Sequence, residues 1–105
     1  LARRLATARA EVAALRAMTL AAVSRARRTE QPGPEGSILR LYYGLLAQRV
    51  SALALDVTGL PALAHDEDPE SWTHRYLYDY AQTIGGGTGE IQKNIIAERV
   101  LGLPR

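Results

Sequence analysis

The segment SILRLYYGLLAQRVSALALDVTG, residues 37–59, places the strongest constraint on the fold of this chain. Its apolar residues recur at helical spacing and fall into two stripes. One stripe holds Ile38, Leu41, Leu45, Gln48, Ala52 and Leu55, and the other holds Tyr42, Leu46, Val50, Leu53 and Val57. A helix that is apolar on two sides is buried between neighbours, so it needs two partner helices or a second chain. The segment therefore predicts a central helix.

Three further segments can supply its neighbours. Residues 1–28 repeat apolar or small residues at alternating steps of four and three and are rich in the strong helix formers alanine and leucine. Residues 29–37 contain two prolines and two glycines, which predict a connection. A short third helix is predicted to start at Asp68-Pro69-Glu70 and a fourth to run from 88 to 102. We expect one all-α domain over residues 1–105, an up-and-down bundle of four helices with the third short.

Local signals predict where these helices begin and end. Ser37 and Thr88 are expected N-caps, because a hydroxyl oxygen can accept a hydrogen bond from a free amide in the first turn. Gly59 is expected to end the second helix, with a proline shortly after it. In the third helix, Trp72, Tyr76 and Tyr80 share one face, as their spacing of four residues predicts; this face favours packing in the core or at an interface over ligand stacking.

Composition and charge limit the possible functions. The 105 residues include no cysteine, which excludes disulfides, thiolate chemistry and zinc–thiolate sites and suits the cytoplasm. The formal charge of +2 is too small to argue for nucleic acid. No apolar run is long enough for a membrane span, and no signal peptide is visible. The acidic run at 65–68 lacks metal-ligand spacing, so we expect a solvated loop and no metal site. Leu1 falls within a helical pattern, which indicates a piece of a longer chain.

A run of three glycines, Gly85 to Gly87, precedes the last helix. Free amides and the helix dipole at such a point can hold an anion, including a phosphate. The P-loop pattern is absent, since it needs a Gly-Lys-Ser/Thr ending after a strand, and no βαβ unit supports a dinucleotide fingerprint. Spacing alone therefore leaves a plain turn and an anion-binding turn both open.

The closing segment GGGTGEIQKNIIAERVLGLPR resembles the signature of acyl-CoA dehydrogenases. In that family a Gly-Thr pair leads into a helix whose pattern is matched here by Glu90-Ile91-Gln92-Lys93 and then by Ile96-Ala97-Glu98-Arg99. The ending VLGLPR resembles the bacterial, especially the actinobacterial, branch. A weaker likeness covers residues 8–23 and 37–59, so the resemblance spans nearly the whole chain.

The resemblance implies the C-terminal helical domain of an FAD-dependent oxidoreductase of fatty acid or lipid metabolism. Such an enzyme removes hydrogens from Cα and Cβ of an acyl-CoA thioester: a carboxylate takes the proton, FAD takes the hydride, and an acceptor removes the electrons. The domain also builds a tetramer, either homomeric or heteromeric. Carried over to this sequence, the cofactor-binding residues are Gly87, Thr88, Glu90 and Gly59, and the substrate-pocket wall is Gly85 and Gly86.

Three departures from the family pattern matter. The usual catalytic glutamate is replaced by Gly86, so we expect no catalytic residue here; either the base lies on an earlier segment or the subunit has lost it. The missing side chain leaves room for a bulky or branched acyl group. Asp56 and Leu60 replace a family glutamine and glycine near Gly59, and an aspartate near a pyrophosphate would repel it. We expect the isolated domain to be inactive. The alternative is a non-catalytic partner subunit or a stand-alone helical oligomerisation module.

Overall fold

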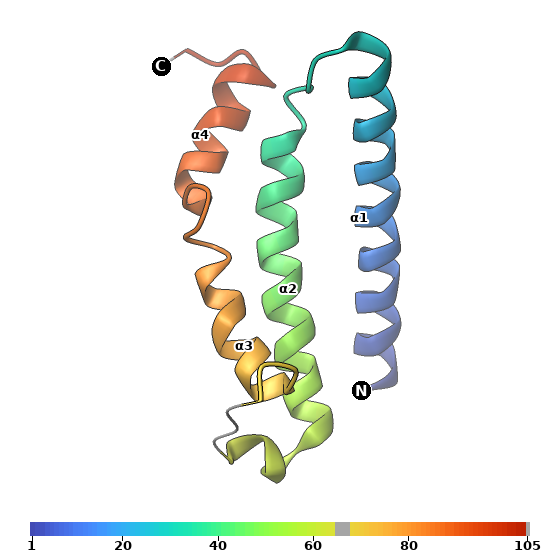
Figure 1. Cartoon of the computed structure of the whole chain (residues 1–105), viewed down its shortest axis with the longest axis vertical. Helices are drawn as coiled ribbons and strands as arrows, with labels where there is room; N and C mark the ends of the chain where they lie inside the picture. The colour runs from blue at the N-terminus through green and yellow to red at the C-terminus, as the bar shows by residue number, and fades with distance from the viewer. Residues whose placement is uncertain (65–67, 105) are drawn as a thin grey trace.

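The computed structural model describes residues 1–64 and 68–104, and it confirms an all-α fold of four α-helices (Figure 1). No strand occurs in these two ranges. In chain order the elements are α1 (Ala2–Thr29), α2 (Gly36–Thr58), the short 3-10 helix η1 (Leu60–Leu63), α3 (Trp72–Ala81) and α4 (Gly89–Arg99).

Helix α2 is the central element, as its two apolar stripes predicted. Helix α1 runs along one side of α2, while α3 and α4 follow each other along the other side (Figure 1). Within the described chain, α2 contacts α1, α3 and α4, and these three helices make no contacts with one another. The four helices form three columns, since α3 and α4, joined by the glycine run, make up one column together. The arrangement is open.

This open arrangement leaves much apolar surface exposed. Only Leu46, Leu53 and Ala62 are buried apolar side chains among the described residues. The accessible surface is 7861 Å², whereas a compact monomer of 11.4 kDa is expected to expose about 5,800 Å². The radius of gyration is 16.4 Å, against about 13 Å for a compact domain of this length. The described helices therefore carry apolar faces that they do not cover themselves.

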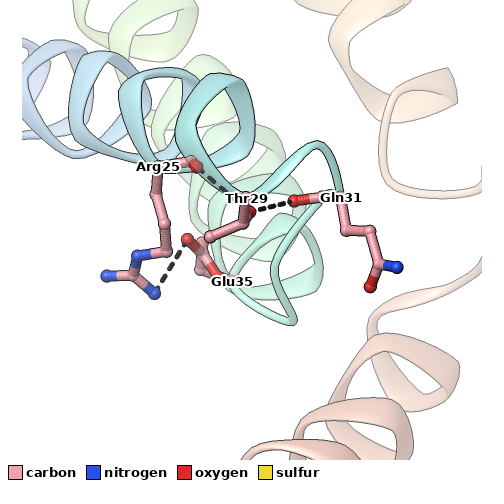
Figure 2. A network of polar contacts seen from close by, with 4 residues as sticks. All are labelled: Arg25, Thr29, Gln31 and Glu35. Carbon is pink, nitrogen blue, oxygen red and sulfur yellow. Dashed lines mark hydrogen bonds and ion pairs between the residues drawn. The ribbon is translucent and has the colours of Figure 1, made fainter.

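Polar contacts hold the connection between α1 and α2 (Figure 2). Arg25 of α1 pairs with Glu35 at 3.1 Å, and the Thr29 hydroxyl lies 3.1 Å from the carbonyl oxygen of Arg25 and 3.0 Å from that of Gln31. The predicted N-cap at Ser37 is wrong, since α2 begins at Gly36 and its N-cap is Glu35, two residues before Ser37. The Glu35 side chain, which is turned toward Arg25, makes no capping hydrogen bond to α2.

Helix α3 starts later than predicted. A side-chain oxygen of Asp68 accepts a hydrogen bond from the Glu70 amide at 2.9 Å, which makes a turn where the sequence suggested a first helical turn with Pro69. The helix is capped instead by Ser71, whose hydroxyl accepts from the His74 amide at 3.1 Å. Local side-chain bonds of this kind compete with helix formation, which accounts for the shift.

Two other sequence expectations concern membranes and metals. No helix in the described ranges is both long and apolar enough to cross a membrane. Among the described residues, no three His, Cys, Asp or Glu side chains gather so as to hold a metal ion. Residues 65–67, most of the acidic run for which a solvated loop was expected, lie outside the described residues.

Candidate functional site

The N-terminus of α4 forms as the sequence predicted. The Thr88 hydroxyl accepts a hydrogen bond from the Ile91 amide at 3.4 Å, and the first backbone bond of the helix runs from the Gln92 amide to the Thr88 carbonyl at 2.9 Å. The amides of Gly89 and Glu90 precede that first bond and so have no acceptor within the helix. The start of α4 therefore offers donors at the positive end of the helix dipole, beside the exposed side chain of Glu90.

The segment from Gln82 to Thr88, here called the glycine turn, joins α3 to α4. Gly86 and Gly87 have positive φ angles of 75° and 99°, whereas Gly85 does not. A Cβ atom on Gly87 would lie 2.8 Å from the side-chain nitrogen of Gln92, and one on Gly86 would lie 3.3 Å from Nε of Arg40. The glycine turn therefore needs glycine at 86 and 87 for conformation and for space.

Two side chains from different helices hold backbone carbonyls of the glycine turn, and Gln48 of α2 donates to the Thr83 hydroxyl at 3.5 Å. Arg40 of α2 donates hydrogen bonds from Nη2 to the carbonyl oxygens of Gln82 and Gly85. Gln92 of α4 is 7% exposed and donates from its amide to the carbonyl of Gly86 at 2.8 Å. The sequence did not predict a role for Arg40, and it indicated Gln92 only as one position of the family pattern. No spacing rule relates position 40 to position 85, so only the packing of α3 onto α2 reveals the contact.

The predicted site residues fall into two places. Gly85, Gly86, Gly87, Thr88 and Glu90 lie together in the glycine turn and the first turn of α4. Gly59 lies at the C-terminal end of α2 with a φ of 69°. Gly44 of α2 packs against the turn, and Gly59 lies 15 residues further along the chain, or about 22 Å of helix. Gly59 is therefore far from the other predicted site residues.

The expected repulsion by Asp56 is offset within the chain. Arg4 of α1 lies 2.7 Å from a side-chain oxygen of Asp56, and both side chains are more than half exposed, at 57% and 53%. An ion pair of this kind contributes little to stability, but it places a positive charge beside the carboxylate. The surface near Gly59 is therefore less negative than the sequence alone indicated.

An apolar trough opens beside α2, between α1 and α3. Its larger part is a groove of about 550 Å³, and a neighbouring cavity of about 240 Å³ continues it. The residues common to both parts are Val12, Val50 and Trp72. The second part is also lined by Asp79, whose side chain is buried. The trough is the largest apolar hollow described on the chain.

The aromatic face of α3 is largely exposed. The hydroxyls of Tyr76 and Tyr80 lie 3.0 Å apart, and their rings meet edge to face at 5.4 Å. The shared hydrogen bond with Tyr76 raises the pKa of the Tyr80 hydroxyl, since it favours the protonated form. Trp72 is 50% exposed and lines the trough. Of the two packing roles predicted for this face, the core does not apply to Trp72 and Tyr80, which are about half exposed, and an interface role stays a prediction.

Comparison with known proteins decides the family. The family model described as "Acyl-CoA dehydrogenase, C-terminal domain" matches residues 1–101. This chain belongs to the acyl-CoA dehydrogenase family. The resemblance seen in the closing segment is thus confirmed across almost the whole chain.

Two curated relatives agree with this assignment. The chain is 46% identical over 77 residues to acyl-CoA dehydrogenase IpdE1 of Mycobacterium tuberculosis (strain ATCC 25618 / H37Rv), covering 72% of this chain and 20% of that protein. It is 43% identical over 77 residues to acyl-CoA dehydrogenase IpdE1 of Mycolicibacterium smegmatis (strain ATCC 700084 / mc(2)155), covering 72% of this chain and 19% of that protein. The matched part thus spans about one fifth of the length of these relatives. No solved structure matches the chain significantly.

Proposed function

We propose that this chain is the C-terminal helical domain of a longer, FAD-dependent acyl-CoA dehydrogenase, which oxidises the Cα–Cβ bond of an acyl-CoA thioester. The observation that carries the proposal is the glycine turn. Two glycines with positive φ stand immediately before the Thr88-capped start of α4, in a chain that matches the family's C-terminal domain. The turn thereby combines a wall without side chains and a helix N-terminus.

The chemistry of this turn fits a dinucleotide such as FAD. A Cβ atom on Gly87 would collide with the Gln92 side chain, so glycine there lets the turn pack closely against the start of α4. The amides of Gly89 and Glu90 and the Thr88 hydroxyl are donors suited to its polar groups, and the helix dipole favours negative charge. The Glu90 carboxylate is an acceptor and suits a ribose hydroxyl rather than a phosphate. FAD, when bound, supplies the acceptor for the hydride; we assign Gly59 to the FAD of a neighbouring subunit.

The residues at 85 and 86 suit a pocket wall but supply no base. Glycine has no group that can take a proton, so the carboxylate must come from another part of the enzyme or from another subunit. Gly85 and Gly86 are both exposed, and a Cβ atom on Gly85 would meet only the Ala81 carbonyl, at 3.4 Å. A Cβ atom on Gly86 would stand toward Arg40, so the free space along the wall is at Gly85. We propose that this space admits a bulky or branched acyl group. A non-catalytic partner subunit is the second candidate, and the glycine at 86 is the observation that favours it.

The exposed apolar surface supports a role in assembly. The accessible surface is larger than that of a compact domain of this size, and its apolar part includes the trough and the open sides of α1. We propose that the rest of the enzyme and neighbouring subunits cover these apolar surfaces in a homo- or hetero-tetramer. An electron-transfer acceptor would reoxidise the flavin. A cytoplasmic location stays a prediction of the cysteine-free sequence.

The test uses the full-length protein that contains this chain. We expect the purified protein to show flavin absorbance and to lose it anaerobically when acyl-CoA thioesters are added, more with bulky acyl groups than with short straight ones. Flavin that binds but bleaches only after a co-purified partner is added would identify the partner-subunit alternative. Failure to bind FAD at saturating concentration, both alone and with the co-purified partner, would refute both. Residues 1–105 alone serve as the control, and we expect no activity from them.

A further inference from the structure

Packing alone does not fix the glycine turn. A cavity of about 50 Å³ lies between the turn and α2, with Leu41 and Leu45 on the helix side and Gly87 on the turn side. Consecutive glycines also lose more conformational freedom on folding than other residues. The close contact that the structure shows is at Gly44, where a Cβ atom would lie 3.3 Å from the Thr83 methyl group. The conformation of residues 85–87 therefore depends on polar contacts.

Arg40 provides the contacts that reach backbone carbonyls of the turn from α2, whereas Gln48 of α2 donates to the Thr83 hydroxyl at a longer 3.5 Å. Nη2 of Arg40 carries two hydrogens and donates hydrogen bonds to two carbonyls, those of Gln82 and Gly85. Both carbonyls follow the last turn of α3. Both acceptors are neutral, so these bonds leave the positive charge of the guanidinium in place. That charge also complements the negative end of the α3 dipole. Gln92 completes the arrangement by holding the carbonyl of Gly86.

The charge of Arg40 lies directly behind the proposed site. Its Nε would be 3.3 Å from a Cβ atom on Gly86, so no side chain separates the guanidinium from the backbone at that position. A cation at this distance, partly screened from water by the turn, favours negative charge on the other side of the turn. The turn is thus both held in shape and made more positive by one residue of α2.

We propose that Arg40 is a positioning residue for the cofactor and acyl-CoA site. It fixes the glycine turn so that the amides of Gly89 and Glu90 and the Thr88 hydroxyl are positioned to bind the cofactor, and it adds positive potential behind them. The part of the inference that concerns the turn's conformation is independent of the ligand. The part that concerns FAD rests on the proposed function.

Hydrogen exchange on the full-length protein tests the conformational part. The amides of Thr83, Ile84 and Gly85 donate to carbonyls of Tyr80 and Ala81, so their exchange reports opening of the turn. We expect Arg40→Met to speed their exchange about tenfold or more, the factor that corresponds to loss of a charge-assisted hydrogen bond. Unchanged exchange in these amides would overturn the inference.

A matched control comes from the same helix. Arg49 pairs with Glu11 of α1 at 3.0 Å, is itself about half exposed, and makes no described contact with the glycine turn. Arg49→Met removes the same chemical group, and we expect it to leave exchange at residues 83–85 unchanged. Should Arg40→Met fail to fold, Arg40→Gln carries the same measurement. A glutamine is neutral and shorter, so we expect faster exchange at residues 83–85, and unchanged exchange overturns the inference.

FAD affinity tests the positioning part. We expect the dissociation constant for FAD to rise about ten- to hundredfold in Arg40→Ala, less in Arg40→Lys, and to fall again when guanidinium ion is added at low concentration. A merely structural role would not give rescue by guanidinium. Faster exchange with unchanged FAD affinity would overturn the positioning role. If the unsubstituted protein binds no FAD, the proposed function fails, while the exchange result still decides whether Arg40 holds the turn.

Discussion

Replacing each of the three glycines by alanine in turn should give three different results, because their backbone and surroundings differ. Gly85 has no positive φ, and a Cβ atom there would meet only the Ala81 carbonyl, at an ordinary 3.4 Å. Gly86→Ala places a side chain at φ 75°, which costs about 1–2 kcal/mol in the left-handed region. Gly87→Ala adds a contact of 2.8 Å with the Gln92 amide, so the hydrogen bond to Gly86 must also give way.

The expected free energies follow from these terms. We expect Gly85→Ala to change the stability of the turn by less than about 0.5 kcal/mol, since its backbone conformation does not require glycine. Gly86→Ala should cost about 1–2 kcal/mol. Gly87→Ala should cost about 2–3 kcal/mol, because the lost hydrogen bond adds about 1 kcal/mol. The steps between these values are large enough to rank the three variants in one experiment.

Hydrogen exchange of the peptide that covers residues 82–92, measured in the full-length protein, provides the assay. The free energies correspond to exchange faster by about 5- to 30-fold for Gly86→Ala and about 30- to 150-fold for Gly87→Ala. Gly85→Ala is the matched control and should leave exchange within a factor of about two. Equal effects at the three positions would refute the reasoning, since they would mean that the backbone conformation of the turn does not distinguish them.

Three other substitutions test different parts of the molecule. Gly86→Glu should not raise turnover of the full-length enzyme, because its Cβ atom would lie 3.3 Å from Nε of Arg40 and we expect its carboxylate to pair with the guanidinium; a gain in kcat would contradict this. Tyr76→Phe should lower the raised pKa of Tyr80 toward its ordinary value, so a spectrophotometric titration should lose its latest-ionising tyrosine; an unchanged curve would contradict the shared hydrogen bond. Val50→Asp, in the apolar trough, should reduce assembly of the full-length protein in size-exclusion chromatography, and an unchanged elution volume would remove the trough from the interface.

Several features could be predicted from the sequence because they depend on local chemistry or on periodicity. The two stripes of α2 predicted a helix with neighbours on both sides, and the structure places α1 on one side and α3 with α4 on the other. The Thr88 cap depends on residues within one turn of each other, and it forms as expected. The end of α2 at Gly59 is also correct.

The features that sequence reasoning missed depend on contacts between distant residues. Arg40 donates to carbonyls that lie 42 and 45 residues further along the chain. Every residue has a backbone carbonyl, so the sequence does not indicate which ones accept these bonds. The cap expected at Ser37 is wrong because α2 begins at Gly36, so Ser37 lies inside the first turn, while Glu35 pairs with Arg25 of another helix. The late start of α3 reflects a choice between two competing caps, Asp68 and Ser71, which periodicity cannot resolve.

The glycine at position 86 and the arginine at position 40 are physically linked. A side chain at 86 would place its Cβ atom 3.3 Å from Nε of Arg40, so we expect a carboxylate there to form an ion pair with the guanidinium. The ion pair would hold the pKa of that carboxylate below the range useful for a base. It would also draw Arg40 away from the carbonyls of Gln82 and Gly85, which the structure shows it holding. We therefore expect that a carboxylate at 86 would pair with Arg40 and would be a poor base while Arg40 holds the turn. In the enzyme we propose, the proton is taken by a carboxylate from elsewhere, because glycine at 86 has no group that can accept it.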